Sequence, residues 1–148
     1  MPRYFTLESA RRILPEVRRL MAAAMQARAE MAEIRQRVEA FRERVGLLGG
    51  VSLGALNEGG WRSIAERAAG QMRRSLEAME EIGAQVKDLG MGLVDFPTLY
   101  RGREVLLCWR MGEPDIAWWH GADEGFQGRK PVDEDFERHH GGAGQGHA

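Results

Sequence analysis

The chain of 148 residues contains a single cysteine, Cys108. One thiol excludes an intramolecular disulfide and any zinc site built from several cysteines, which is typical of proteins from a reducing compartment. Long apolar runs are absent as well. No stretch approaches the ~20 apolar residues that a membrane-spanning helix needs, and the N-terminus lacks the apolar segment of a secretory signal. We therefore expect a cytoplasmic protein with no membrane partner.

A strong excess of one charge sign is also missing, since the formal net charge is only -1. The charges are nevertheless uneven, because residues 1–45 carry a net +4 and residues 91–148 a net -4. Arginines of the N-terminal part alternate with glutamates at helical spacing, as Arg37 does with Glu33, which is typical of a solvated helix. This pattern argues against nucleic acid as a partner.

The residues that are present, 43% hydrophobic and 29% charged, are typical of a folded protein. Apolar residues from Val17 to Val45 recur at alternating steps of three and four, which predicts a long helix with a heptad seam. Thr6 is placed to cap the N-terminus of this helix, and Pro15 either kinks it or separates a short first segment from it. A second apolar stripe over residues 60–88 predicts an antiparallel partner helix across a glycine-rich connection.

After residue 92 the pattern changes to short runs of Trp, Val and Leu bounded by glycine and proline. This punctuation predicts strands near residues 93–99, 103–111 and 116–120. The connections between them are short enough for consecutive antiparallel pairing. We therefore expect a three-stranded meander.

The sequence thus predicts an α+β fold in one domain, residues 1–137. A coiled-coil-like antiparallel helical hairpin (6–88) joins a small β-module (92–132). Residues 138–148 are rich in glycine and histidine and have nothing to bury, so we expect a disordered C-terminal tail.

The strand register decides which side chains can meet. With tight turns on both sides of the middle strand, Trp109 faces Val94 and His120 faces Leu107. Because side chains alternate between the faces of a sheet, this register places His120 on one face and Asp95 on the other. An error of one residue reverses that conclusion.

The chain contains the motifs Leu107-Cys108-Trp109, Trp119-His120 and Gly125-Phe126-Gln127-Gly128-Arg129, preceded by Gly92-Leu93-Val94-Asp95-Phe96-Pro97 and an opening Tyr4-Phe5-Thr6-Leu7. In these segments it resembles an uncharacterised bacterial family that is known only as a domain of unknown function, DUF2203. The resemblance covers about residues 4–132. It implies no activity, cofactor or partner.

Candidate metal ligands gather in the β-module. His120, Glu113 and Asp95 are the first candidates for binding a divalent metal cofactor, with Asp115 and Asp123 as further candidates, since imidazole and carboxylate groups are common ligands of such ions. The alternative is a structural His120 that hydrogen-bonds loop backbone at the edge of the sheet.

Three arginines suggest a second candidate site. Arg103, Arg110 and Arg129 would hold a phosphate or carboxylate if their guanidinium groups converged, with Trp119 as a stacking wall. The alternative for Arg110 is a structural ion pair with Asp95, its diagonal neighbour in the predicted register.

Cys108 and His120 would form a nucleophile pair only if the imidazole lay beside the thiol, because a base must draw off the thiol proton. The predicted register points the two side chains to opposite faces. We therefore expect Cys108 to be a buried and inert thiol.

These observations leave two functions open. The leading hypothesis is a non-enzymatic interaction module that forms homo-oligomers through its helical hairpin and recognises a partner through its Trp-rich β-module. The alternative is a small metal- or anion-dependent enzyme, similar to a hydrolase, with its site at the edge formed by Glu113, His120 and Arg129. No motif in the sequence identifies a substrate.

Overall fold

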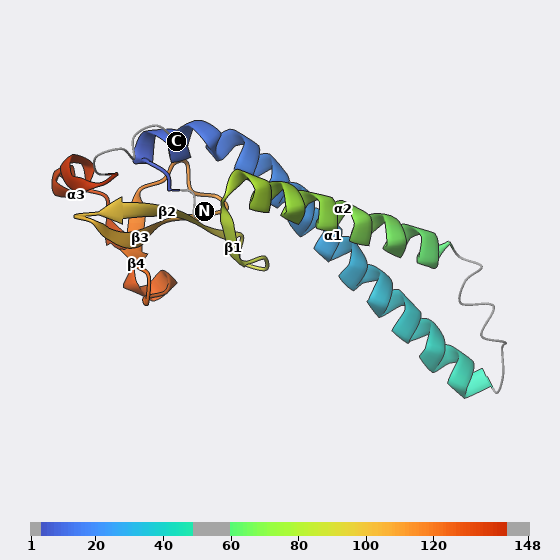
Figure 1. Cartoon of the computed structure of the whole chain (residues 1–148). Helices are drawn as coiled ribbons and strands as arrows, with labels where there is room; N and C mark the ends of the chain where they lie inside the picture. Colours follow the sequence, from blue (N-terminus) through green and yellow to red (C-terminus); the bar gives the residue numbers. More distant parts are fainter. Residues whose placement is uncertain (1–3, 49–59, 142–148) are drawn as a thin grey trace.

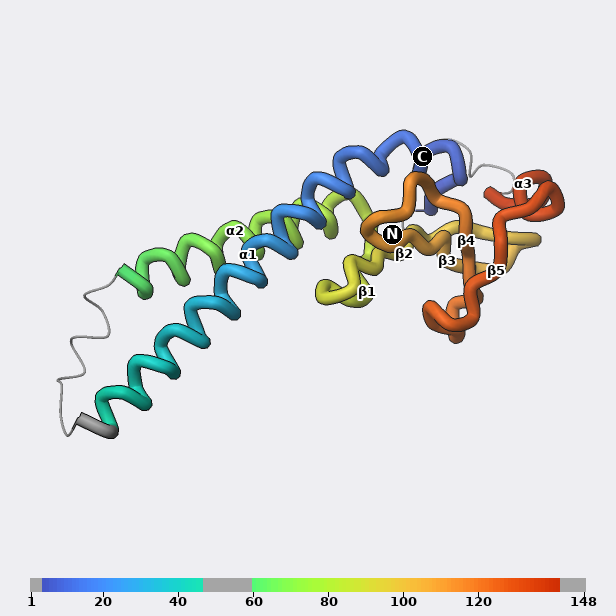
Figure 2. The backbone as a smooth tube through the Cα atoms, turned by 180° about the vertical axis from the view of Figure 1, so that it is seen from behind, coloured from blue at the N-terminus to red at the C-terminus, as the bar shows by residue number. Residues whose placement is uncertain are grey.

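The structure is a computed structural model that describes residues 4–48 and 60–141. It has two parts, a β-module and a helical arm that projects from it (Figure 1). Helix α1 (Leu7–Leu48) belongs to both parts, and α2 (Trp61–Ile82) returns beside it. Seen from behind, the two helices leave the β-module on the same side (Figure 2). Within the described residues, no helix is long and apolar enough to cross a membrane.

Helix α1 begins at a reciprocal cap. The backbone N–H of Ser9 donates to Thr6 Oγ1 at 3.0 Å, and the N–H of Thr6 donates to Ser9 Oγ at 2.9 Å. The predicted cap at Thr6 is therefore confirmed. The helix continues through Pro15 without a break, so the question of a separate first segment is answered in favour of one helix.

The predicted seam of α1 is buried unevenly. Its members from Val17 to Ala27 are buried, whereas those from Met31 to Val45 are half-buried and lie on the projecting part of the helix. Helix α2 packs along this stretch, and Phe41 meets Trp61 edge to face with ring centroids 5.7 Å apart. The hairpin expected from the apolar spacing is thus present.

Helix α2 is shorter than predicted. The prediction of helix over residues 60–88 was wrong beyond Ile82, because Gly83 adopts a left-handed conformation with φ 95°. Its N–H donates to the carbonyl oxygens of Met79 and Glu80, which closes the helix. The chain then extends as strand β1 (Gln85–Asp88).

The sheet contains five antiparallel strands in sequential order. Strand β1 is followed by β2 (Leu93–Tyr100), β3 (Arg103–Arg110), β4 (Trp118–Gly121) and β5 (Lys130–Pro131). The α+β class is confirmed, but the expected three strands are joined by two short edge strands. Strand β1 was missed because its apolar spacing also suits a helix. Strand β5 was missed because it is too short to show the alternation of apolar and polar side chains that marks a strand.

The register between β2 and β3 is confirmed, since Val94 pairs with Trp109. The register between β3 and β4 was predicted wrongly by one residue, because His120 pairs with Leu106 and not with Leu107. The connection is not a tight turn. Ile116 leaves the sheet to be fully buried in the core, and its carbonyl oxygen accepts hydrogen bonds from the Arg11 guanidinium.

The sheet face toward α1 forms the main core with the N-terminal half of that helix; its fully or almost fully buried members include Leu14, Val17, Met21, Val94, Phe96, Leu107, Trp109 and Ile116. The corrected register places His120 on the other face, together with Asp95 and Cys108. All three of these side chains are buried as well.

The predicted tail begins inside an ordered element. Helix α3 (Glu134–His139) is followed by His140, whose Nε2 accepts a hydrogen bond from the backbone N–H of Leu7 at 2.9 Å. Disorder from residue 138 was therefore wrong for residues 138–141. The physical reason is Phe136, which is fully buried and anchors the segment. The rest of the predicted tail, residues 142–148, lies outside the described residues.

Candidate metal centre

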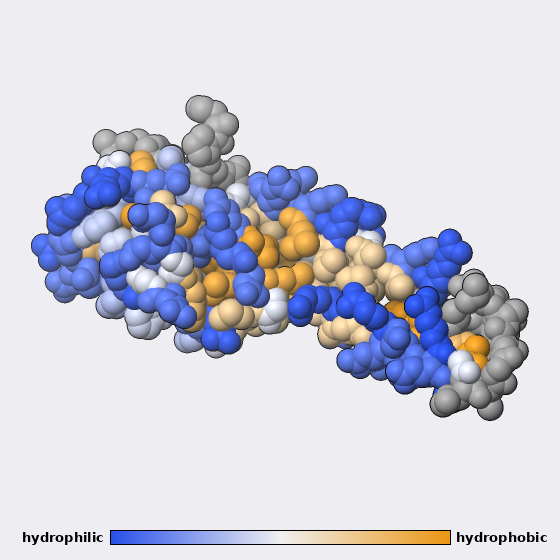
Figure 3. Space-filling view, turned by 90° about the horizontal axis from the view of Figure 1, so that it is seen from below, coloured by the Kyte–Doolittle hydropathy of each residue, from blue (hydrophilic) through white to orange (hydrophobic). Residues whose placement is uncertain are grey.

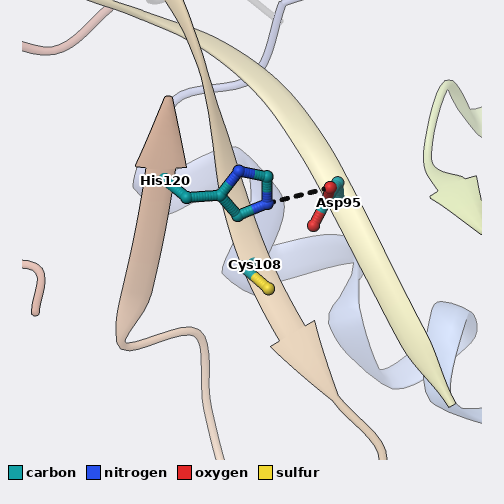
Figure 4. Close-up of side chains that lie close together, drawn as sticks. All are labelled: Asp95, Cys108 and His120. Carbon is teal, nitrogen blue, oxygen red and sulfur yellow. Dashed lines mark hydrogen bonds and ion pairs between the residues drawn. The ribbon is translucent and has the colours of Figure 1, made fainter. Parts of the chain in front are cut away.

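Three neighbouring strands each direct one side chain into a small cluster on the sheet face opposite α1. Asp95 comes from β2, Cys108 from β3 and His120 from β4 (Figure 4). Their ligand atoms, one oxygen, one sulfur and one nitrogen, all lie within 4.8 Å of one another. The three residues are only 2%, 0% and 3% exposed. A polar group of this kind needs strong internal partners to remain buried.

The contact between His120 and Asp95 needs a proton or a metal ion between the two side chains. His120 Nδ1 lies 2.8 Å from the carbonyl oxygen of Gly121. Because a carbonyl oxygen only accepts, Nδ1 carries a hydrogen. Nε2 lies 3.0 Å from Asp95 Oδ2. The lone pair of Nε2 and a carboxylate oxygen repel each other, so a cation lies between them, which is either a proton or a metal ion.

The second carboxylate oxygen of Asp95 is left over. Oδ1 is buried and has no hydrogen-bond partner among the described residues. A buried acceptor without a partner costs about 1–3 kcal/mol. The Cys108 thiol beside this carboxylate is only a weak donor, whereas a metal ion held by the carboxylate would satisfy the oxygen fully.

Cys108 completes the cluster with a thiol that is protonated at neutral pH. Burial, together with the nearby carboxylate of Asp95, raises the pKa of this thiol to about 12. A thiol in this state is a poor nucleophile, as the sequence predicted. The prediction that Cys108 and His120 point to opposite faces was wrong, however, because it rested on the mistaken register of β4.

The donor set suits zinc better than magnesium or calcium. Zinc binds thiolate sulfur at about 2.3 Å and imidazole nitrogen or carboxylate oxygen at about 2.0–2.2 Å, whereas the other two ions prefer oxygen alone. Tetrahedral geometry separates such ligand atoms by about 3.3–3.7 Å. The 3.0 Å between Nε2 and Oδ2 would have to widen by a few tenths of an ångström. No fourth His, Cys, Asp or Glu joins the group in the part of the chain that the structure describes.

Glu113, the third ligand predicted from the sequence, lies elsewhere. Its two carboxylate oxygens accept hydrogen bonds from the Arg129 guanidinium at 2.6 and 2.8 Å. One of them also accepts from the backbone N–H of Arg110 at 2.7 Å. The predicted ligands Asp95 and His120 are thus brought together, and Cys108 stands where Glu113 was expected.

Arg129 forms the wall of the cluster. Its guanidinium donates to the carbonyl oxygen of Cys108 at 3.2 Å and lies over the rings of Phe126 and Trp118, 4.6 and 5.2 Å from their centroids. Its side chain is 11% exposed. The bidentate pair with Glu113 offsets the positive charge that Arg129 would otherwise place beside a bound cation.

The predicted anion site does not form from its three arginines. Arg103 and Arg110 stand at opposite ends of β3, and Arg110 lies over the Phe126 ring. Trp119 belongs to the α1-facing side of the sheet, because it pairs with Leu107. Arg103 and Trp119 do line one surface hollow.

The other predicted side chains have structural partners. Asp95 interacts with His120 and forms no ion pair with Arg110 among the described residues. Asp115 pairs with Arg11 at 3.4 Å. Sequence reasoning placed Asp95 and Cys108 correctly on one face, and only the position of His120 was missing. The buried Ile116 in the preceding loop was the signal that the loop is not a tight turn.

Fold and site together define a class of protein: an α+β domain in which a helical hairpin carries a five-stranded meander with a buried carboxylate, thiol and imidazole cluster. The family model described as an uncharacterized conserved protein (DUF2203) matches residues 3–132, and the chain therefore belongs to this family. The matched region includes both long helices and all five strands, and it ends before α3. No curated protein and no solved structure matches the chain.

Proposed function

We propose that the protein is a metal-binding module whose β-module holds a divalent transition-metal ion, with zinc preferred, on Asp95, Cys108 and His120. The observation that carries this proposal is the buried cluster of Asp95, Cys108 and His120, whose ligand atoms lie within 4.8 Å of one another and in which the contact of His120 Nε2 with Asp95 Oδ2 needs a proton or a metal ion between the two atoms. The sulfur of Cys108 lies close enough to serve as the third ligand.

Burial favours a structural role for the ion. Catalytic zinc sites keep one coordination position open to water or substrate, whereas structural sites are closed. All three ligands are at most 3% exposed, so the fourth coordination position, which no His, Cys, Asp or Glu of the described residues fills, faces the protein interior and not a substrate. An ion at this place would join β2, β3 and β4 and would stabilise the sheet against unfolding.

Zinc and cobalt titrations of chelator-treated protein test the proposal. We expect zinc to raise the melting temperature, and cobalt to produce the absorption band of a thiolate-bound ion. Both effects should disappear in a His120→Ala variant. They should persist in His139→Ala, which removes an exposed imidazole on α3. A zinc response that survives His120→Ala would show that the ion binds elsewhere.

A second candidate function concerns the hairpin. We infer that the projecting part of the hairpin associates with a second copy of this chain, because two helices alone leave apolar surface uncovered. Ile64 is 39% exposed, and the seam of α1 from Met31 to Val45 is only half-buried. Seen from below, apolar residues continue from the β-module onto the hairpin (Figure 3).

Sedimentation of the purified chain tests this association. We expect a dimer that a double variant, Met31→Glu with Ile64→Glu, converts into a monomer while the helix content stays the same. A strict monomer at high concentration would exclude the second function and would leave the metal site untouched.

A further inference from the structure

A second aromatic group lies at the end of the sheet away from the hairpin. Tyr100 of β2 and Trp119 of β4 have ring centroids 5.0 Å apart. Phe136 of α3 stacks on both of them, at 5.0 and 5.2 Å. Phe136 is fully buried in this position. The Phe136 side chain thus packs on an aromatic surface formed by Tyr100 and Trp119, which we call the aromatic seat.

Polar contacts hold α3 over this seat. The Asp135 carboxylate accepts hydrogen bonds from the Tyr100 hydroxyl and, at 2.6 Å, from the Arg101 guanidinium. The backbone N–H of Arg101 donates to the carbonyl oxygen of His139 at 3.0 Å. The helix itself has six residues and would not be stable alone. Its order depends on these contacts.

The covering helix is not part of the region that defines the family. The family model ends at residue 132, whereas Tyr100 and Trp119 lie well inside it. The sheet therefore contributes the seat from its shared region, and a C-terminal extension of this chain fills it.

One carboxylate of α3, that of Asp135, complements the guanidinium of Arg101 beside the seat. Phe136 is surrounded in sequence by Asp133, Glu134, Asp135 and Glu137. Beside the seat lies a hollow of about 470 Å³, whose charged lining residues are Arg101, Arg103, Glu104, Asp123, Glu124 and Lys130.

Two of the carboxylates in this hollow already have partners. Lys130 lies 5.0 Å over the Trp119 ring and pairs with Glu124 at 2.6 Å. Glu104 accepts a hydrogen bond from the Tyr4 hydroxyl. The guanidinium of Arg103, in contrast, has no hydrogen bond or ion pair within residues 4–48 and 60–141. It is available to a carboxylate from outside.

We propose that Tyr100, Trp119 and Arg103 form a docking site for a partner peptide that presents an aromatic side chain between carboxylates, and that α3 occupies this site as an intramolecular competitor. The partner places its aromatic ring where Phe136 lies and its carboxylates against Arg101 and Arg103. The inference is independent of the metal centre, which lies on the other face of the sheet.

The competition predicts that loosening α3 exposes the docking site to a peptide. A tethered segment has an effective concentration in the millimolar range, so α3 excludes a weaker peptide in trans. Loss of the Asp135 contacts removes part of this advantage and leaves the aromatic seat intact. A variant that loosens α3 should therefore bind a peptide that the wild-type chain rejects.

A fluorescent peptide with the sequence of residues 131–141 is the probe, and anisotropy is the readout. We expect Asp135→Ala to bind it at least about tenfold more tightly than the wild-type chain. The matched control is Glu134→Ala, whose carboxylate pairs only with Arg138 on the same helix, and it should behave like the wild type. A peptide with Ala in place of Phe136 should not bind.

Further variants separate the outcomes. Phe136→Ala should also bind the peptide, and where it fails to fold by circular dichroism the Asp135→Ala result decides. Adding Arg103→Glu to Asp135→Ala should weaken binding. Equal affinity of wild type and Asp135→Ala, or no binding to either variant, would overturn the proposal. So would exchange of α3 between two copies of Asp135→Ala, because the occupant would then be the chain itself.

Discussion

Replacing Asp95 by asparagine tests whether a proton or a metal ion lies between Asp95 and His120. The amide of asparagine has nearly the shape of the carboxylate and carries N–H donors. One of them can donate to the free lone pair of His120 Nε2, which keeps the contact seen at 3.0 Å. The variant therefore retains a hydrogen bond between two uncharged groups and needs no metal ion there, but it loses an anionic ligand.

The expected magnitudes differ between the metal-free and metal-bound protein. Exchange of a charge-assisted for a neutral hydrogen bond should cost about 1–2 kcal/mol without metal. For a chain of this size that lowers the melting temperature by roughly 3–6 °C. Asp95→Ala, which leaves the buried imidazole unpaired, should cost about 3–5 kcal/mol.

Zinc should stabilise the wild-type chain by about 2.7 kcal/mol at a hundredfold excess over its dissociation constant. This corresponds to roughly 8 °C. If Asp95→Asn weakens zinc binding a hundredfold, the same zinc concentration contributes only about 0.4 kcal/mol. The shift then shrinks to about 1 °C.

Differential scanning calorimetry on chelator-treated samples, with and without zinc, measures both effects. Equal zinc shifts in the wild type and in Asp95→Asn would refute the proposed coordination. A wild-type chain that shows no shift at millimolar zinc would refute the metal site itself, and a proton would then be the cation between the two residues.

Three further predictions follow from single side chains. The pKa of Cys108 is raised from 9.0 to about 12 in the folded protein, so the thiol ionises at lower pH in the unfolded chain. The resulting stabilisation of the folded state, up to about 4 kcal/mol, is complete below pH 9 and is lost as the pH rises toward 12. The free energy of unfolding of Cys108→Ala, measured by urea titration at several pH values, should therefore fall less steeply over this range than that of the wild type. Parallel pH profiles of the two proteins would contradict the raised pKa. Glu113→Ala leaves Arg129 buried without its carboxylate and should cost about 3 kcal/mol, whereas Glu77→Ala at the exposed pair with Arg73 should change stability by less than about 1 kcal/mol in the same titration. Gly83→Ala forces a side chain into the left-handed region and should cost about 1–2 kcal/mol by thermal unfolding, and no loss would mean that the helix end rearranges.

The sequence predicted those elements whose pattern is local. The apolar steps of α1 repeat over nine positions from Val17 to Val45, and the register of β2 against β3 follows from the two-residue turn at Arg101 and Gly102. The end of α2 was missed although Gly83 is visible in the sequence, because the apolar spacing on both sides of it also fits a continuous helix.

The site could be predicted only in part, because the missing information is not local. The register of β4 depends on Ile116, which enters a core built by α1 and is held there through Arg11, more than a hundred residues earlier in the chain. Order in α3 likewise depends on rings from two separate strands. Neither contact produces a periodic pattern of apolar residues in the sequence of its own segment.

Helix α1 is one continuous element of 42 residues, or about 63 Å at 1.5 Å per residue. The first half of α1 packs on the sheet and the second half extends away from it, so a change in helix direction would pivot near Ala27. A tilt of about 5° at the sheet displaces the far end, some 30 Å away, by roughly 3 Å. A partner bound at the tip of the arm would therefore act on the sheet through the core that the first half of α1 shares with β2 and β3.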